Sequence, residues 1–193
     1  MGMPAYIRRW TTAEVRELSD ESRHWPRYEL IDGELLVTPA PRPVHQIAVG
    51  TLFRIIADYV DGERVGLTLT SPADLELEAG SITQPDIFVV PSAHARHEVP
   101  LREWNQVRAL LLAVEVVSPS SVRTDRGTKR EFFQRVGVPD YWVVDLDARV
   151  VERWHPTGTA PDVSSDVLEW NPDGATKPLS LDLAAFFANV LGA

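Results

Sequence analysis

The sequence contains no cysteine, and this absence excludes several kinds of chemistry at once. Disulfides, thiolate-bound zinc, iron–sulfur clusters and cysteine nucleophiles cannot occur in a chain of 193 residues without Cys. No apolar run approaches the ~18–20 residues that a membrane span requires, and no signal-peptide pattern is present. We therefore expect a globular protein without a membrane partner, located in the cytoplasm.

Positive charge is scarce as well, and lysine is its rarest carrier. The chain has 19 Lys and Arg residues against 28 Asp and Glu residues, a formal net charge of -9. Such a field repels nucleic acid on average, so binding to DNA requires a local basic patch. Only Lys129 and Lys177 are lysines, which makes the position of each one informative.

Motifs of several enzyme classes are missing too. There is no Walker A loop, no G-x-G-x-x-G fingerprint and no G-x-S-x-G elbow. P-loop nucleotide hydrolysis, dinucleotide binding and α/β-hydrolase chemistry therefore have no support. The serine-rich segment 118–121 is typical of a strand-to-helix turn with a helix N-cap.

The length and the pattern of apolar residues predict one α/β domain. A chain of this length buries roughly two-thirds of its unfolded surface. We expect residues 1–193 to form a single domain, with an N-terminal arm to residue 25, a core from about 26 to 156 and a C-terminal extension over 157–193. A long helix precedes most strands and another separates two of the most apolar ones, which favours a mixed sheet flanked by helices.

Single elements follow from spacing and turn residues. Asp32-Gly33 between two apolar runs predicts a hairpin, and the almost unbroken apolar run 109–117 is typical of a central strand. Residues 157–165 are expected to form a loop, and 91 to about 106 a polar irregular segment. Apolar residues at helical spacing predict helices over 44–60, 122–136 and about 182–191.

Two acidic residues interrupt runs that otherwise read as core strands. Asp86 lies in QPDIFVV and Glu115 in ALLLAVEVV. Buried carboxylates are unfavourable unless they are paired, hydrogen-bonded or bound to a cation, so two of them suggest a shared partner. Mg²⁺ takes oxygen ligands, commonly one or two carboxylates plus waters and phosphate oxygens, and fits such a pair. The alternative is that each acid lies at a strand end in solvent or in a structural ion pair.

Lys129 is expected to lie close to these acids. It shares a helical stripe with Val122, Phe133 and Val136, and that stripe is the one that faces the sheet. An ammonium there needs an anionic neighbour, and Glu115 lies near the end of the strand that leads into this helix. Unlike Arg, a partly buried lysine can also donate or accept a proton near neutral pH. The alternative is a lysine whose stem runs along the helix face and whose ammonium reaches water.

Several short motifs follow one another in a characteristic order. They are YELIDGE (28–34), His45-Gln46 at the start of a helix, Gln84-Pro85-Asp86, VEVVSPS (114–120), Lys129 and GVPDYWVVD (137–145). In order and spacing they resemble the Uma2 family, a group of restriction-endonuclease-like proteins with the PD-(D/E)XK nuclease fold. The resemblance covers about residues 28–154. It implies that fold, with a mixed central sheet flanked by helices, and a Mg²⁺-dependent phosphodiesterase activity.

The resemblance also implies roles for four catalytic residues. Asp86 would be the acid of the PD pair and Glu115 the second acid, with Val117 where the lysine usually stands. Lys129 would reach that volume from the following helix and position or deprotonate the attacking water. Asp86 and Glu115 would hold Mg²⁺, or Mn²⁺ as a substitute. Glu29 matches a further acidic position that would complete the ligand shell or serve a second metal.

Contacts to the substrate are expected around this centre. Gln84 lies beside Asp86, where it could orient a water, and His45 is expected at the substrate because of the resemblance. A histidine at a helix end is more often a cap. The predicted helix 122–136 carries five cations against two acids, a local net charge of +3. We expect phosphate contacts and salt-sensitive DNA binding from Arg123, Arg126 and Arg130.

These features together predict a Mg²⁺-dependent endonuclease that hydrolyses the phosphodiester bonds of DNA. A homodimer is expected, because two active sites serve the cutting of two strands. Two alternatives stay open. One is a catalytically silent module that binds nucleic acid or protein through a nuclease fold, which the acidic composition and the displaced lysine permit. The other is a nuclease that acts on RNA.

Overall fold

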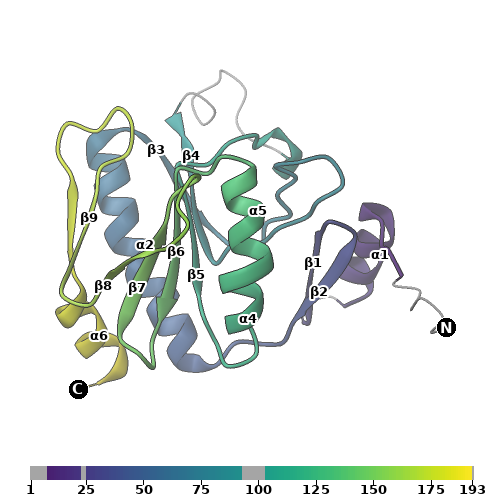
Figure 1. The fold of residues 1–193 in the computed structure, drawn as a ribbon, viewed down its shortest axis with the longest axis horizontal. Coiled ribbons are helices and arrows are strands. Elements are labelled where there is room, and N and C mark those ends of the chain that lie inside the picture. Colours follow the sequence, from purple (N-terminus) through teal and green to yellow (C-terminus); the bar gives the residue numbers. More distant parts are fainter. Residues whose placement is uncertain (1–7, 23–24, 93–102, 193) are drawn as a thin grey trace.

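A six-stranded mixed sheet forms the centre of the computed structural model, which describes residues 8–22, 25–92 and 103–192 (Figure 1). Only β5 and β6 run parallel, and the other neighbours are antiparallel. The predicted α/β class with a mixed sheet is therefore confirmed. In spatial order the strands are β3 (Gly66–Thr70), β4 (Ile87–Pro91), β5 (Leu112–Val116), β6 (Asp140–Asp145), β7 (Val150–Trp154) and β8 (Asp162–Ser164).

Helices cover both faces of this sheet. The long helix α2 (Pro43–Glu63) lies on one face together with α6 (Leu183–Leu191), and the helical segment that follows β5 lies on the other (Figure 1). Because β5 is covered on both faces, its side chains alternate between two cores. Val114 and Val116 pack toward α2, while Ala113 packs in the second core, with Phe132.

The helix predicted over 122–136 is present but not uniform. It consists of α4 (Val122–Thr124), a π-helical turn η2 (Asp125–Lys129) and α5 (Arg130–Arg135). It ends where predicted, because Gly137 adopts a positive φ of 76° that suits a residue without a side chain. The π-helical turn is the part that carries Lys129, and such turns are often found at functional sites.

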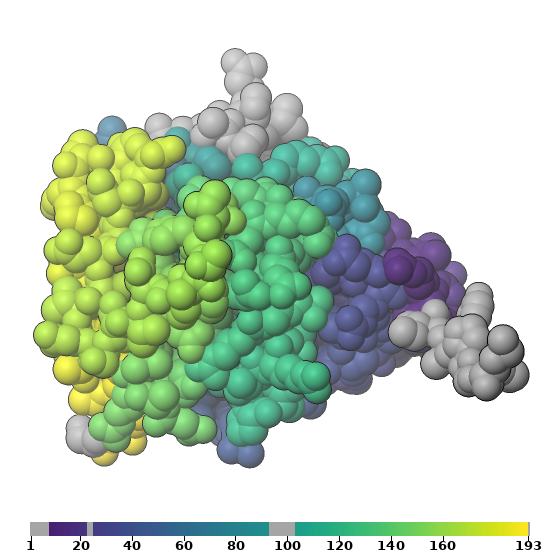
Figure 2. All heavy atoms as spheres, in the orientation of Figure 1, coloured from purple at the N-terminus to yellow at the C-terminus, as the bar shows by residue number. Residues whose placement is uncertain are grey.

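The predicted hairpin forms a separate two-stranded sheet. Strands β1 (Arg27–Ile31) and β2 (Glu34–Thr38) are joined by Asp32 and Gly33, both at positive φ, as in a tight hairpin turn of the mirror-image type. Reciprocal backbone hydrogen bonds between Leu30 and Ile82 connect the hairpin to the rest of the chain. Helix α1 (Thr12–Ser22) packs on it, and Figure 2 shows this unit at the opposite end of the molecule from the C-terminal segment.

The C-terminal segment differs from the expectation. Residues 157–165 were expected to form a loop, but β8 (Asp162–Ser164) lies within them and pairs with β7 as the outer strand of the sheet. A second hairpin of β9 (Val167–Trp170) and β10 (Leu179–Asp182) follows and places Trp170 in the core on the α2 face. The short polar strand escapes prediction because it gains its stability from pairing rather than from a buried face.

Most of the expected irregular segment 91–106 lies outside the described residues. Its described end carries a short 3-10 helix, η1 (Trp104–Gln106). Within the described ranges, the structure contains no helix that is both long and apolar enough to cross a membrane.

Gly66 is expected to be essential for the pairing of β3 with β4. A Cβ atom at Gly66 would overlap the backbone carbonyl oxygen of Val90, whereas a Cβ at Gly50 on α2 would meet nothing within 4 Å. Gly66→Ala should therefore lower the free energy of unfolding by roughly 2–3 kcal/mol. Gly50→Ala, the matched control, should raise it by roughly 0.5–1 kcal/mol through its helix propensity. Urea denaturation of both variants measures the difference, and equal effects would contradict the assigned strand register.

Candidate active site

The two predicted acids lie side by side on neighbouring strands. Asp86 directly precedes β4, and Glu115 lies in β5, which pairs antiparallel with β4. Because Ile87 pairs with Val114, the same register places Asp86 opposite Glu115. Opposite residues of an antiparallel pair project to the same face of a sheet. Both acids are buried.

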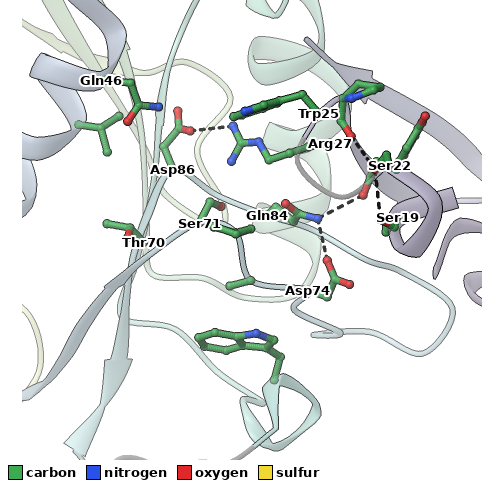
Figure 3. A pocket seen from close by; sticks show the side chains of 16 residues that line it. Ser19, Ser22, Trp25, Arg27, Gln46, Thr70, Ser71, Asp74, Gln84 and Asp86 are labelled. Carbon is green, nitrogen blue, oxygen red and sulfur yellow. Dashed lines mark hydrogen bonds and ion pairs between the residues drawn. The ribbon is translucent and has the colours of Figure 1, made fainter. Parts of the chain in front are cut away.

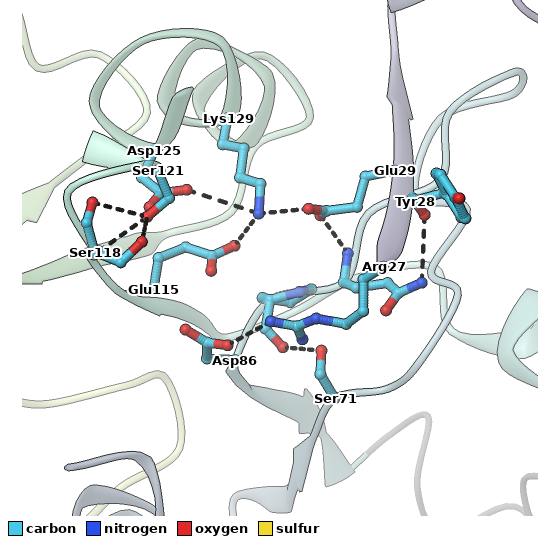
Figure 4. A network of polar contacts seen from close by, with 12 residues as sticks. Arg27, Tyr28, Glu29, Ser71, Asp86, Glu115, Ser118, Ser121, Asp125 and Lys129 are labelled. Carbon is cyan, nitrogen blue, oxygen red and sulfur yellow. Dashed lines mark hydrogen bonds and ion pairs between the residues drawn. The ribbon is translucent and has the colours of Figure 1, made fainter. Parts of the chain in front are cut away.

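Lys129 lies above these acids and is surrounded by carboxylates (Figure 4). Its Nζ is 2.7 Å from Glu29 Oε2, 2.9 Å from Glu115 Oε1 and 3.7 Å from Asp125 Oδ1. The lysine is only 4% exposed, so its ammonium does not reach water along the helix face. The structure thus brings Lys129 and Glu115 together from helix and strand, as their positions in the sequence indicate.

Glu29 lies between Lys129 and the backbone of Gln84, and its role as a metal ligand stays a prediction. One of its carboxylate oxygens accepts a hydrogen bond from the backbone N–H of Gln84 at 2.7 Å, and the other contacts Lys129. Both oxygens are therefore engaged by protein groups. The structure makes Glu29 the residue that holds the lysine in position and ties the β1–β2 hairpin to the site.

Asp86 is held by three donors that come from three elements. Arg27 Nη2 of β1 lies 3.1 Å from Oδ1, while His45 Nε2 of α2 and the backbone N–H of Val116 each lie 3.0 Å from Oδ2. His45 thus contacts the acid of the predicted PD pair. Its Nδ1 is buried and has no hydrogen-bond partner among the described residues.

Two residues of the site are not predicted from the sequence. Arg27 precedes Glu29 by two positions in the same strand, so both point to one face, and Asp125 precedes Lys129 by four positions in the helical segment. These spacings are the signals that could have revealed them. Gln84 is near the site, but its side-chain amide donates to Asp74 at 2.7 Å and lies in a neighbouring cavity.

The pKa values of the two acids shift in opposite directions. Burial raises the pKa of Asp86, but the hydrogen bond and charge of His45, the charge of Arg27 and the Val116 N–H lower the pKa to about 2. Burial raises the pKa of Glu115 well above its usual value; Lys129 lowers this pKa, while Asp86 and the other acids raise it further. Asp86 is thus a carboxylate at neutral pH, and Glu115 resists ionisation.

Lys129 itself stays charged. Burial lowers its pKa, but the charges of Glu115, Glu29 and Asp125 outweigh this and raise the pKa well above the usual value. Burial also raises the pKa of Asp125, against the charge of Lys129 and a hydrogen bond from Ser121. An ammonium this strongly held is a fixed positive charge and not a base.

The charge balance and the donor types fit a divalent cation. The cluster holds four carboxylates against two permanent cations, a formal charge of -2 with neutral histidine; its members are Glu29, Asp86, Glu115, Asp125, Arg27 and Lys129. Within the described ranges, no group of three or more acidic or histidine side chains is arranged to hold a metal. A site of two carboxylates completed by water and phosphate oxygens is nevertheless the ordinary manner of Mg²⁺ binding.

A cavity of about 270 Å³ gives access to this cluster. Asp86, Glu115 and Lys129 all line it, together with the serine-rich turn 118–121. Arg42, the N-cap residue of α2, lines it as well; this side chain is exposed and makes no ion pair with any other described residue. The amino end of a helix as long as α2 adds positive potential there.

Most cations of the predicted basic patch on the helix form ion pairs with acidic side chains. Arg126 contacts Asp145 and Glu152, each at 2.7 Å, and Arg130 contacts Glu131 at 2.7 Å. Arg135 bridges Asp32 and Glu78. Of the arginines expected to contact phosphate, only Arg123 is exposed without an ion pair among the described residues. The partners of Arg126 and Arg135 come from distant parts of the chain, which the local count of charges could not include.

Fold and site together define a restriction-endonuclease-like α/β protein, with paired acids on adjacent strands and a lysine above them. The chain belongs to the Uma2 family, described as "Putative restriction endonuclease", whose match covers residues 12–188. A crystal structure of a putative nuclease belonging to DUF820 from Anabaena variabilis ATCC 29413 has a similar fold, with a TM-score of 0.69 and 23% identity over 86% of this chain and 92% of that chain. Among curated proteins, none matches the sequence. The family supports a nuclease, and thus a hydrolase that acts on nucleic acid.

Glu115 is expected to reduce the stability of the fold at neutral and alkaline pH. Because its folded-state pKa lies above the unfolded value, its stabilising contribution is present at pH below about 4.5 and is lost as pH rises through the folded pKa. Glu115→Gln should therefore raise the free energy of unfolding at pH 8. Tm should rise with it, by about 2–4 °C for each kcal/mol gained in a chain of this length.

Asp140 provides the matched control for this substitution. It is also buried in a strand, but it accepts hydrogen bonds from Arg153 and Trp170 without competing acids in contact. Asp140→Asn should lower Tm. If Glu115→Gln lowered Tm in the same way, the surplus of negative charge assigned to the cluster would be wrong.

Proposed function

We propose that the protein is a divalent-metal-dependent endonuclease that hydrolyses phosphodiester bonds of DNA. The observation that carries the proposal is the convergence of Asp86, Glu115 and Lys129 in one accessible cavity with an excess of negative charge. Membership of the Uma2 family supports the nuclease class. That DNA is the substrate and Mg²⁺ the metal, with Mn²⁺ as a substitute, is proposed in addition to the nuclease class.

Asp86 and Glu115 are the residues that would hold the metal. Such an ion, when bound, neutralises charge on the phosphoryl group and lowers the pKa of a coordinated water. Asp86 is already ionised, and a divalent cation would favour the ionised form of Glu115 by offsetting the acids around it. Arg27 and His45 fix the carboxylate of Asp86 in place.

Lys129 would act through its charge. Its ammonium is held by Glu29, Glu115 and Asp125, and its pKa is raised, so removal of the water's proton does not suit it. A fixed ammonium at the cavity wall is instead suited to stabilising negative charge that develops on phosphate oxygens. Glu29 would not contact the substrate; it would position Lys129 through their ion pair.

Approach of the substrate phosphate is assigned to the side of α2. Arg42 lies at the cavity, exposed and without an ion pair to another described residue, and the amino end of α2 is adjacent. Arg123 is a second candidate near the helical segment. Arg126 and Arg130 would have to leave their carboxylate partners to contact phosphate, so their contribution is expected to be small. Formation of a homodimer stays a prediction.

Substitution of the three central residues tests the activity. Asp86→Ala and Glu115→Ala should abolish Mg²⁺- or Mn²⁺-dependent cleavage of DNA, and Lys129→Met should reduce it by about 10²-fold or more, since the charge that stabilises the transition state is lost. The measurement is cleavage of labelled duplex and single-stranded DNA, with RNA in parallel.

Lys177→Met is the control, because Lys177 is the other lysine of the chain and is exposed. It should leave cleavage unchanged. Metal binding is followed separately by calorimetry with Mn²⁺. A wild-type protein that neither binds the ion nor cleaves any substrate would favour the silent nuclease-fold module.

Arg42 should contribute to substrate binding without being needed for the fold. Arg42→Ala should raise KM or Kd for DNA by about 3- to 10-fold, as expected for the loss of one phosphate contact, and should make the salt dependence shallower. Arg54→Ala is the matched control, because Arg54 is an exposed arginine of the same helix about 18 Å further along it. Equal effects of both substitutions would rule out a specific contact by Arg42.

A further inference from the structure

A second cavity adjoins the proposed active site, and we propose that it binds an unpaired nucleobase of the substrate strand. The inference rests on the proposed nuclease function and names the form of its substrate: a single strand, or a strand with an unpaired nucleotide next to the phosphate at Asp86. The cavity is larger than the one above the acids, with a volume of about 550 Å³. That volume lies in the range of sites for small organic molecules.

The two cavities share a wall. Arg27 and Asp86 line both of them, and Figures 3 and 4 show the contact between their side chains. A group bound in the larger cavity would therefore be a direct neighbour of a phosphate bound over Asp86 and Glu115. In a nucleotide, one sugar joins the base to the phosphate, so the base is the group that would occupy the neighbouring cavity.

Aromatic side chains give this cavity surfaces for stacking. Trp25 and Trp104, which line it, are 37% and 38% exposed. Each indole packs against one other side chain. The Arg27 guanidinium carbon lies 5.0 Å from the centre of the Trp25 ring, and the Phe88 and Trp104 rings form a T-shaped pair with their centres 6.1 Å apart. Two supported indoles with exposed area form the kind of platform on which bases stack in proteins that bind single strands.

Polar groups in the same wall suit the edge of a base. Asp74 carries a carboxylate that accepts only from Gln84 among the described side chains, and burial raises its pKa. Gln46 from the first turns of α2 is exposed and lines the cavity, as Asp86 does (Figure 3). A carboxylate and an amide offer acceptors and donors to the amino and imino groups of an unpaired base.

The charge distribution favours this mode of binding over a purely electrostatic one. The chain carries a net charge of -9, and most arginines of the α4–α5 segment form ion pairs with carboxylates of the protein. Binding of a duplex along its backbone needs several free cations. Where these are few, affinity has to come from contacts that do not depend on charge, and stacking is the strongest of these for nucleic acid.

The geometry points to an unpaired base and not to a base within a duplex. In a duplex both faces of each base are covered by neighbours and its pairing edge is occupied, so tryptophans cannot stack on it unless it leaves the helix. Single-stranded DNA, single-stranded RNA and an unpaired nucleotide all present the same faces and edges. The experiment separates these sources.

Binding is measured by fluorescence anisotropy on the wild-type protein in EDTA, so that cleavage cannot occur. The probes are one sequence as single-stranded DNA, single-stranded RNA and duplex DNA, and an abasic single strand of the same length. Both base-containing single strands, or one of them if the sugar is recognised, should bind at least fivefold more tightly than the duplex and the abasic strand. The salt slope should correspond to about one or two phosphate contacts.

Substitution of the tryptophans identifies the cavity. Trp25→Leu and Trp104→Leu should each weaken binding of the single strand by about fivefold or more, and should not change binding of the abasic strand. Trp25→Phe and Trp104→Phe should retain most of the affinity because they keep an aromatic face. Trp154→Leu, outside the cavity and beneath Arg130, is the control, and circular dichroism confirms the fold of each variant.

The outcomes distinguish this inference from the proposed function. Base-dependent binding that the Leu variants lose, without cleavage in Mg²⁺ or Mn²⁺, would support the base site and contradict the endonuclease. Metal-dependent cleavage that is equal for duplex and single strand, and insensitive to both Leu substitutions, would overturn the base site and leave the endonuclease standing. Equal binding of abasic and base-containing strands, or no binding of either, would also overturn the base site.

Discussion

The contact on which the site depends is the one between the buried ammonium of Lys129 and the carboxylates around it. Glu29 comes from β1, Glu115 from β5 and Asp125 from the same helical segment, so one cation joins three parts of the chain. Removal of the ammonium from such a cluster would leave its carboxylate partners buried and unpaired, which is strongly unfavourable. The lysine therefore links the hairpin to the sheet, besides its proposed role in the reaction.

The same cluster differs from a structural ion-pair network in its balance of charges. A structural network tends toward balanced charges, as at Asp140, whose carboxylate accepts from Arg153 and Trp170. Around Lys129 the acids exceed the cations. Burial raises the pKa of Glu115 and of Asp125, and the neighbouring acids raise both further. Under the proposed function, a divalent cation would offset this excess of negative charge. The proposed metal site would thus need the carboxylate of Glu115, although that carboxylate lowers the stability of the fold on its own.

Much of the centre could be predicted because its residues violate the local pattern. Asp86 and Glu115 interrupt apolar strands and Lys129 occupies a stripe that faces the sheet, so their types conflict with their surroundings. The arginines could not be predicted in the same way. Arg126 is neutralised by residues 19 and 26 positions away, and Arg135 by partners further still. Such pairing depends on the tertiary structure, as does the short strand β8.

The position of the lysine on a helix has a consequence for the rest of the molecule. Val117, where a lysine of the strand would stand, belongs instead to the core on the α5 side. A lysine on the helix needs an anchor beyond the sheet, and the hairpin supplies it through Glu29. Two positions earlier the same strand supplies Arg27, which holds Asp86 and lines both cavities. The hairpin therefore does not merely cover the site: alternate residues of β1 hold Lys129 and Asp86, and in the proposed mode of binding Arg27 would lie between the phosphate and the base.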